Sequence, residues 1–293
     1  MNIAIIGAGA LGAALAKVLT DAGQRFAQWD VATEKLPKQI TTQEAVGGAE
    51  IVLLCIPTNS TRAAAEVILP HLPQDAIVVS LSKGMEAETG KLIDELLDEV
   101  FPDHETALLS GPMLAAELSA GKLGAATVAA DDRETSQRVI ESLNGTALIL
   151  ESSTDRRGVA LCGVLKNIYA IGLGIAHSLD WGENANGWLI AHVLGEMEAI
   201  ATELGGQRET IFSVAGIGDF VATALSETSR NHQYGFALAR GETPSYVSEG
   251  AIALPKLLDR LGASVNQPFL QAIRNVVIDH DDPVQVFTTL RRR

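Results

Sequence analysis

The chain has 293 residues, of which 47% are hydrophobic and 20% are charged, so it is a globular protein long enough for one large domain or two with separate cores. Its 22 Lys and Arg residues against 36 Asp and Glu give a formal net charge of −14, which argues against nucleic acid or an anionic membrane surface as a partner. An anionic small molecule stays compatible with this charge, because a few local basic groups are enough to hold one.

Features of metal sites, secretion and membrane insertion are absent from the sequence. The two cysteines, Cys55 and Cys162, lie in apolar stretches and predict buried, reduced thiols in a cytoplasmic protein. The six histidines show no metal-ligand spacing, so we expect no metal site. The opening MNIAII runs directly into a glycine motif rather than a signal peptide, and no apolar run reaches the roughly 18 residues of a membrane span.

The first half of the chain alternates short apolar runs with helical patterns. We predict strands at 2–7, 25–30, 49–57, 76–84, 106–112, 124–130 and 146–152, and helices at 10–23, 60–72, 91–101 and 133–143. This alternation predicts an α/β fold in which residues 1–153 form a Rossmann-like, doubly wound parallel sheet.

From residue 154 to 293 the pattern predicts an all-helical domain, with helices at 158–178 and 184–205 and shorter ones through 290. Ligand sites favour domain interfaces and the carboxyl ends of parallel strands. We therefore expect a site in a cleft between a dinucleotide-binding domain and a helical substrate domain.

The first strand–helix turn, GAGALG, contains Gly7, Gly9 and Gly12. Glycines at this spacing let the backbone approach a pyrophosphate, and the helix N-terminus supplies N–H donors and a favourable dipole. Asp30 ends the second predicted strand, where a carboxylate binds the adenosine ribose hydroxyls and repels a 2′-phosphate. NAD is therefore favoured over NADP, which stays the alternative cofactor. The competing interpretations are a tight turn without a ligand and a solvated loop acid.

Polar side chains interrupt four apolar stretches, and a buried ammonium is costly unless it is paired or neutral. SLSKGME contains Lys83, LSGPMLAAE a tight Gly111-Pro112 turn, GVLKN both Lys166 and Asn167, and GIGDFVATALSETSRN the residues Asp219, Thr223, Arg230 and Asn231. Taken singly, Lys166 could extend its stem to water, Lys83 and Arg230 could be surface charges, and Asp219 could cap a helix. Together they suit an anionic, oxygen-rich substrate beside a nicotinamide.

The sequence resembles the NAD(P)-dependent glycerol-3-phosphate dehydrogenases of the bacterial type along nearly its full length. The stretches that carry the resemblance are GAGALGAALA, LCIPTNSTR, SKGME, LSGPMLAAE, GVLKNIYAIGLGIA, ENANGWLI, AGIGDFVAT, SRNHQYGFALARG and VSEG. Neither chance nor a generic Rossmann dehydrogenase would give LKN, GxGD and SRN in this order.

The resemblance implies that Lys166 is the catalytic acid/base, with Asn167 and Asp219 orienting it and the substrate hydroxyls. A lysine in a partly desolvated cleft has a lowered pKa, so it can deliver a proton to a ketone oxygen as hydride adds to carbon. Its ammonium also polarises the carbonyl. We therefore expect Lys166 to face the cleft.

The resemblance assigns the remaining binding roles as well. The substrate set that it implies is Lys83, Gly111, Met113, Thr223, Ser229, Arg230 and Asn231, with Arg230 and Asn231 gripping a phosphate and Ser229 assisting. Thr223 follows Asp219 by one helical turn, so both can point to the same side. The cofactor set is Gly7, Gly9, Ala10, Leu11, Gly12, Asp30, Pro57, Lys83, Ala115, Arg230 and Glu249.

Three departures from the family pattern bear on these roles. Ala10 and Leu11 stand where the family has serine and an aromatic, and Met113 replaces a serine expected to touch substrate. The arginine and long loop that usually follow the second strand are largely missing here. The first two leave the reaction class intact, and the third bears on the choice between NAD and NADP.

The expected activity is interconversion of dihydroxyacetone phosphate and sn-glycerol 3-phosphate with NAD(H), feeding glycerophospholipid synthesis in the cytoplasm. The resemblance also suggests a homodimer. The alternatives are a related dehydrogenase of another small 2-hydroxy or 2-oxo compound or an unphosphorylated polyol, and an NAD-binding sensor without turnover. A sensor has no need of a proton donor, so the set Lys166, Asp219 and Lys83 argues against it.

Overall fold

The first half of the chain forms an open sheet. The computed structural model describes residues 2–38, 40–226, 228–262 and 266–290. Within them seven strands pair in the order β2-β1-β3-β4-β5-β6-β7. The strands are β1 (Ile3–Ile6), β2 (Phe26–Trp29), β3 (Ile51–Leu54), β4 (Ile77–Ser80), β5 (Thr106–Ser110), β6 (Gly124–Ala130) and β7 (Leu148–Ser153). The chain moves from β1 to β2 on one side and then to β3 on the other, so the switch point of the fold lies between β1 and β3.

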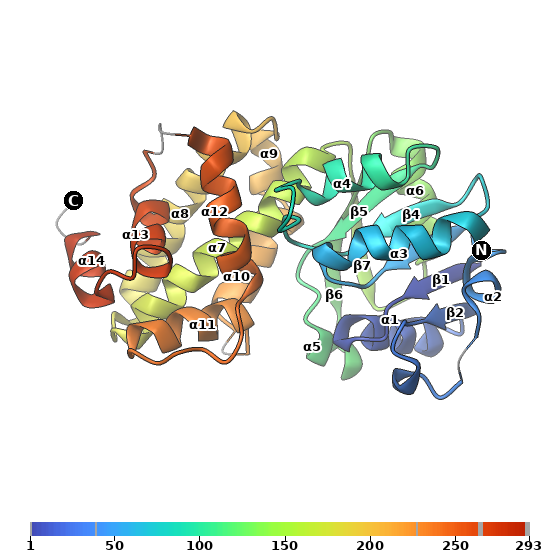
Figure 1. Ribbon diagram of the computed structural model, residues 1–293, viewed down its shortest axis with the longest axis horizontal. Helices are drawn as coiled ribbons and strands as arrows, with labels where there is room; N and C mark the ends of the chain where they lie inside the picture. Colours follow the sequence, from blue (N-terminus) through green and yellow to red (C-terminus); the bar gives the residue numbers. More distant parts are fainter. Residues whose placement is uncertain (1, 39, 227, 263–265, 291–293) are drawn as a thin grey trace.

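Helices cover both faces of the sheet (Figure 1). They are α1 (Ala10–Asp21), α2 (Thr42–Val46), α3 (Thr61–Ile68), α4 (Ile93–Val100), α5 (Ala115–Ser119) and α6 (Arg133–Ser142), with the 3₁₀ turns η1 (Thr33–Lys35), η2 (Thr58–Ser60) and η3 (Leu69–His71). The helix predicted at 60–72 ends at Ile68 because Pro70 cannot continue the helical hydrogen bonds, and the chain goes on as η3. On β1, Ile3 and Ile5 face one buried apolar cluster while Ala4 and Ile6 face the other.

The sheet is parallel, as predicted, except that β5 and β6 pair antiparallel. Their connection contains only α5, a helix of 5 residues that spans about 7.5 Å. A strand as long as β5 spans about 17 Å, so α5 alone does not return the chain to the amino end of the sheet. The chain therefore turns back along β5.

The second half is helical, as predicted, and lies beside the sheet (Figure 1). Its elements are α7 (Arg156–Ser178), α8 (Gly182–Glu203), α9 (Arg208–Ile211), a π-helical turn η4 (Val214–Gly218), α10 (Asp219–Ala224), α11 (Arg230–Ala239), α12 (Glu249–Leu261), α13 (Pro268–Val277) and α14 (Pro283–Leu290). Helix α7 begins earlier than predicted because the Asp155 side chain caps it by accepting the Gly158 N–H at 2.8 Å. The expected division at residue 153 falls in the link between β7 and α7.

Helix α7 organises the helical half. It packs against α8, α10, α11, α12 and α13, and its first turns contact β5 and β6. By length and composition it could cross a membrane, but the whole of its apolar window is buried inside the protein. One apolar cluster runs from the sheet, through Val52 and Leu54, into α7 and the helices around it. Helix α7 is thus a core helix, and the two halves share this core.

Helices α7 and α11 cross at a contact that only glycine permits. A Cβ built on Gly235 would lie 2.0 Å from the Ile171 carbonyl oxygen, and one built on Gly174 would lie 2.0 Å from the His232 carbonyl oxygen. Neither contact involves a flexible side chain that could move aside. The two backbones therefore touch directly, which fixes the position of the amino end of α11.

We predict that Gly235→Ala lowers the free energy of unfolding by about 1–3 kcal/mol, because the added methyl group must push the backbones of α11 and α7 apart. Urea unfolding measures this. Gly195→Ala is the matched control: nothing lies within 4 Å of a Cβ at this position in α8, so alanine should stabilise the helix by about 0.5–1 kcal/mol. Equal effects of the two substitutions would contradict the close crossing.

Candidate active site

Lys83 reaches from the loop after β4 toward the end of the neighbouring strand β5. Its Nζ donates to the Gly111 carbonyl oxygen at 2.8 Å and lies 2.7 Å from Asp219 Oδ2. Gly111 directly follows β5, so the carboxyl ends of two adjacent strands meet at this ammonium. The parallel sheet places Lys83 where Rossmann folds bind their ligands.

Lys166 comes from the middle of α7 and points at α10. Its Nζ lies 3.0 Å from Asp219 Oδ1 and donates to Thr223 Oγ1 at 2.9 Å. Its side chain is only 8% exposed, which excludes the interpretation that it extends to water. Asp219 is the first residue of α10 and not its cap, which is Gly218. Asp219 and Thr223, one turn apart, thus face the same ammonium.

Asp219 bridges two lysines, and this arrangement sets the protonation of the site. Burial lowers the pKa of Lys166 from 10.5 to about 8, although the carboxylate beside it favours the charged form. Burial would raise the pKa of Asp219, but the charges of Lys166 and Lys83 hold it below its ordinary value. Near neutral pH, Asp219 is therefore ionised and Lys166 is close to its own titration.

A second layer of hydrogen bonds holds Asn167 beside this group. The Asn167 amide nitrogen donates to the Lys83 carbonyl oxygen at 2.9 Å and to Glu249 Oε2 at 3.1 Å. Asn231 donates to Asn167 Oδ1 at 2.9 Å and accepts the Gly250 N–H at the same distance. These bonds link α7, α11, α12 and the loop after β4, and they use the side-chain amides of both asparagines.

Arg230 opens α11 and lies at the surface, next to the buried Asn231. Its guanidinium carbon is 4.3 Å from the centre of the Tyr246 ring, and the Tyr246 hydroxyl donates to the Arg230 carbonyl oxygen at 2.8 Å. Ser229 caps α11 by accepting the His232 N–H at 3.4 Å. The structure thus presents an exposed guanidinium at a capped helix start, backed by an aromatic ring.

The glycine turn has the shape that a dinucleotide phosphate needs. Gly7 has φ +110°, and a Cβ on Gly12 would lie 2.2 Å from the Gly7 carbonyl oxygen, so both positions require glycine. A Cβ on Gly9 would meet nothing within 4 Å, and no side chain caps the amino end of α1. The N–H groups of the first turn of α1 are therefore available to an anion, and this turn fits a nicotinamide dinucleotide.

Asp30 is buried beside this turn, so it is not a solvated loop acid. Its Oδ2 accepts the Ala8 N–H at 2.6 Å and its Oδ1 accepts the Ala32 N–H at 2.8 Å. Lys35 lies 3.3 Å from each of the two oxygens. Burial would raise the pKa of Asp30, but these N–H donors and Lys35 lower it. The carboxylate therefore stays charged and ties the glycine turn to the segment after β2.

The other predicted site residues have different surroundings. Met113 is only 7% exposed and belongs to the apolar cluster on the α1 side of the sheet. Its side chain packs in the core and offers the substrate no polar contact in place of the serine of the family pattern. Leu11 packs against the same cluster, and Ala115 begins α5. Ala10 begins α1 and Pro57 precedes η2, and both are exposed to solvent.

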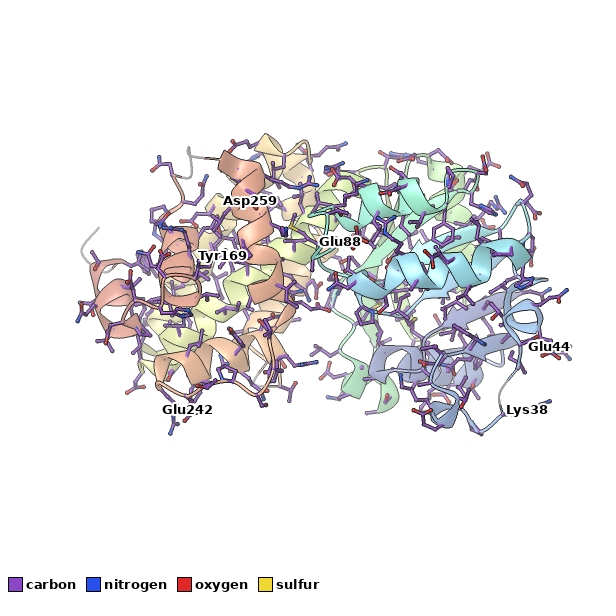
Figure 2. The ribbon with its side chains drawn as sticks, in the orientation of Figure 1. Lys38, Glu44, Glu88, Tyr169, Glu242 and Asp259 are labelled. Atoms are coloured by element: carbon purple, nitrogen blue, oxygen red, sulfur yellow. The ribbon has the colours of Figure 1, made fainter. Side chains whose placement is uncertain are left out.

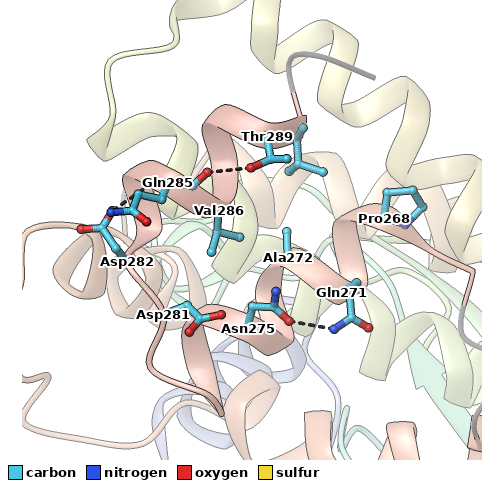
Figure 3. Close-up of a pocket in the computed structure, with 10 residues that line it drawn as sticks. Pro268, Gln271, Ala272, Asn275, Asp281, Asp282, Gln285, Val286 and Thr289 are labelled. Carbon is cyan, nitrogen blue, oxygen red and sulfur yellow. Dashed lines mark hydrogen bonds between the residues drawn. The ribbon is translucent and has the colours of Figure 1, made fainter.

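Two further surface grooves lie elsewhere in the described part of the chain. One, of about 410 Å³, lies between α13 and α14, where Gln271 bonds Asn275 and Thr289 bonds the Gln285 carbonyl oxygen (Figure 3). The other, of about 490 Å³, lies around the start of β5, and half of its lining residues are acidic. Neither groove is lined by Lys83, Lys166 or Asp219, so the lysine–aspartate group remains the candidate active site. In the residues described, no cluster of three or more His, Cys, Asp or Glu side chains could hold a metal ion.

Tyr246 and Lys35 are functional candidates that the sequence did not single out. Tyr246 is separated from Arg230 by the whole of α11, and Lys35 contacts Asp30 across an irregular segment. Helical and strand periodicities do not relate such positions. No pattern in the sequence could have identified them.

Comparison with known proteins gives the family. Residues 155–288 match the family model described as NAD-dependent glycerol-3-phosphate dehydrogenase C-terminus, and residues 32–136 match the corresponding N-terminus. A glycerol-3-phosphate dehydrogenase (NAD(P)+) of Rhizobium etli is 37% identical, with 98% of this chain and 97% of that protein covered. The chain belongs to the NAD-dependent glycerol-3-phosphate dehydrogenase family. The resemblance found in the sequence motifs is thereby confirmed.

Solved structures agree with the family assignment. The crystal structure of glycerol-3-phosphate dehydrogenase from Coxiella burnetii has a TM-score of 0.88 and 27% identity, and covers 100% of this chain and 99% of its own. A ketopantoate reductase from Ralstonia eutropha, at a TM-score of 0.58 and 19% identity, shares only the fold. The whole chain, helical half included, therefore has the architecture of the family.

We predict that Asp219→Ala lowers the free energy of unfolding by about 3–5 kcal/mol, because it leaves the buried Lys166 ammonium without its carboxylate. Chemical denaturation at pH 7 measures the loss. Asp21→Ala is the control, since it breaks a solvent-exposed Lys17–Asp21 pair and should cost about 0.5 kcal/mol or less. Equal losses in the free energy of unfolding for the two substitutions would show that the buried Lys166–Asp219 pair stabilises the fold no more than an exposed pair does.

Proposed function

We propose that the chain interconverts dihydroxyacetone phosphate and sn-glycerol 3-phosphate with a nicotinamide cofactor, in the synthesis of glycerophospholipids. The observation that carries the proposal is a buried lysine with a pKa of about 8, placed by Asp219 beside the carboxyl ends of β4 and β5. This is the combination that ketone reduction requires: a proton donor that titrates near neutral pH, at the ligand-binding edge of a Rossmann sheet.

Lys166 is the proposed acid/base. In ketone reduction its ammonium donates a proton to the carbonyl oxygen as negative charge develops there, and in alcohol oxidation the neutral amine takes that proton back. Asp219 and Thr223 hold the Nζ in place. Lys83 adds a second positive charge that stabilises the developing alkoxide and contacts the substrate. Asn167 positions Lys83 by donating a hydrogen bond to its carbonyl oxygen.

Arg230 is the proposed phosphate ligand, since an exposed guanidinium can bind phosphate oxygens with two parallel hydrogen bonds. Both polar atoms of the Asn231 side chain bond within the protein, so we assign Asn231 to holding Asn167 and Gly250, next to the phosphate. Ser229 contributes by capping the helix that carries both residues.

NAD(P)H supplies the hydride. The glycine turn with the amino end of α1 would hold its pyrophosphate. Glu249 is the proposed contact near the nicotinamide end, and Ala115 is a proposed backbone contact to the dinucleotide. Residues 1–153 form the proposed cofactor domain and 154–293 the proposed substrate domain. The homodimer and the cytoplasmic location remain predictions from the family resemblance.

Initial rates of NADH oxidation with dihydroxyacetone phosphate and with unphosphorylated dihydroxyacetone test the proposal. We expect rapid turnover only with the phosphorylated ketone. Arg230→Ala should raise KM for dihydroxyacetone phosphate by about tenfold or more, because a charge-assisted hydrogen bond contributes about 1.5–3 kcal/mol.

Arg240→Ala is the control for that substitution, since it removes the same charge from the other end of α11. The phosphate assignment fails if Arg240→Ala has the same effect as Arg230→Ala. It also fails if Arg230→Ala weakens both ketones equally. Comparable wild-type rates with the two ketones would contradict the proposed substrate.

A further inference from the structure

The Arg230 guanidinium is held by an aromatic ring and not by a carboxylate. Its carbon lies 4.3 Å from the centre of the Tyr246 ring. Among the residues that the structure describes, no hydrogen bond or ion pair joins this guanidinium to another protein group, and the charge of Glu249 acts on it without such a contact. A guanidinium stacked on a ring keeps its N–H donors in its own plane. These donors therefore remain available to a ligand.

Two other arginines in the described part of the chain lie over aromatic rings, at 5.3 and 5.7 Å, and each also pairs with a carboxylate. They are Arg208, with Phe212 and Glu198, and Arg240, with Phe236 and Glu242. Glu242 lies at the outer edge of the helical half (Figure 2). A paired carboxylate compensates the charge of a guanidinium and occupies its donors. Of these three arginines, Arg230 has the closest ring and keeps its charge uncompensated by an ion pair.

Tyr246 has a fixed position over the first turns of α11. Its hydroxyl donates to the Arg230 carbonyl oxygen at 2.8 Å, and its ring centre lies 6.4 Å from that of Tyr234. Arg230 and Tyr234 are four residues apart, so they face the same side of α11. Tyr234 in turn packs against the apolar cluster that the two halves share. The ring that supports Arg230 is thus tied to the core through the same helix.

The stacking prepares Arg230 for an anion. An exposed arginine has many rotamers, and a ligand that fixes one of them loses part of its binding free energy to that ordering. The Tyr246 ring restricts these rotamers before the ligand arrives. It also covers one face of the guanidinium, so an anion must approach in the plane of the N–H groups. This is the approach by which phosphate accepts two parallel hydrogen bonds.

We propose that Tyr246 is a positioning residue for the substrate phosphate: it orders the Arg230 guanidinium and so strengthens the preference for a phosphorylated ketone. The inference rests on the proposed function, since it concerns the phosphate of the same substrate. Tyr246 already donates its hydroxyl proton to the Arg230 carbonyl oxygen. It therefore acts through Arg230 and not by donating to the phosphate.

A double-mutant cycle tests whether Tyr246 acts through Arg230. KM and kcat for dihydroxyacetone phosphate are measured for wild type, Tyr246→Leu, Arg230→Ala and the double variant. We expect Tyr246→Leu to raise KM about two- to fivefold, which corresponds to a cation–π contact of about 0.5–1 kcal/mol at an exposed site, and to leave kcat within about twofold. The residual kcat/KM for unphosphorylated dihydroxyacetone should not change. In the Arg230→Ala background, Tyr246→Leu should raise KM no further.

Two further Tyr246 variants and one control complete the test. Tyr246→Phe keeps the ring and should leave KM within about twofold of wild type. Tyr246→Gln removes the ring but keeps a polar side chain at the surface, so it repeats the Tyr246→Leu measurement if that variant does not fold. Phe212→Leu is the matched control, because it removes an exposed ring from an arginine that a carboxylate also holds, and it should not change KM. Unchanged affinity for NADH shows that each variant is folded.

The other outcomes overturn the inference. A further rise in KM in the double variant would mean that Tyr246 acts independently of Arg230. A loss of kcat with both ketones would make Tyr246 a structural support of the whole site, and an equal effect of Phe212→Leu would remove its specific role. A raised KM in Arg230→Ala with an unchanged KM in both ring-deleting variants refutes this inference alone. An unchanged KM in Arg230→Ala refutes the phosphate assignment of the proposed function, and this inference with it.

Discussion

The carboxylate of Asp219, buried between two lysine ammoniums, is the interaction on which the site depends. It joins α10 to α7 through Lys166 and to the loop after β4 through Lys83, so it connects the helical half to the sheet. Burying the Lys166 ammonium in this arrangement lowers the folding stability at neutral pH. Since the pKa of Lys166 falls from 10.5 to about 8 on folding, the unfolded chain binds more protons between these values, and stability rises with pH across that interval.

The rest of the helical half serves to hold this group in place. Direct backbone contact between α7 and α11, made through Gly174 and Gly235, brings Asn231 within hydrogen-bonding distance of Asn167. Gly250 at the start of α12 completes the set by donating to Asn231. A Cβ on Gly250 would lie 2.4 Å from the Asn167 carbonyl oxygen, so α12 also meets α7 backbone to backbone. Three helices thus position one amide beside the lysines.

Local patterns in the sequence predicted most of the fold and the centre of the site. Buried strands and amphipathic helices follow from apolar periodicity, and Lys166 was identifiable because a charge inside a core helix requires a partner. The direction of β6 was not predictable from periodicity, because it depends on whether α5 is long enough to return the chain. The pairing of Lys83 with Asp219 joins residues 136 positions apart, which only tertiary structure reveals. For the same reason the contacts of Asp30 with Lys35 and with the backbone N–H groups of Ala8 and Ala32 were not predictable from the sequence.

The central claim is that Lys166 transfers the proton, and the pH dependence of kcat/KM for ketone reduction tests it most directly. The ammonium is the acid, so the wild-type rate should fall as pH rises through about 8, and the rate of alcohol oxidation should rise over the same interval. In Asp219→Asn the fall should move to lower pH, because removing the carboxylate charge lowers the pKa of Lys166 further. In Lys166→Met, checked for retained NADH binding, the residual rate should show no such fall. An unchanged fall in Lys166→Met would assign the proton to another group and contradict the account.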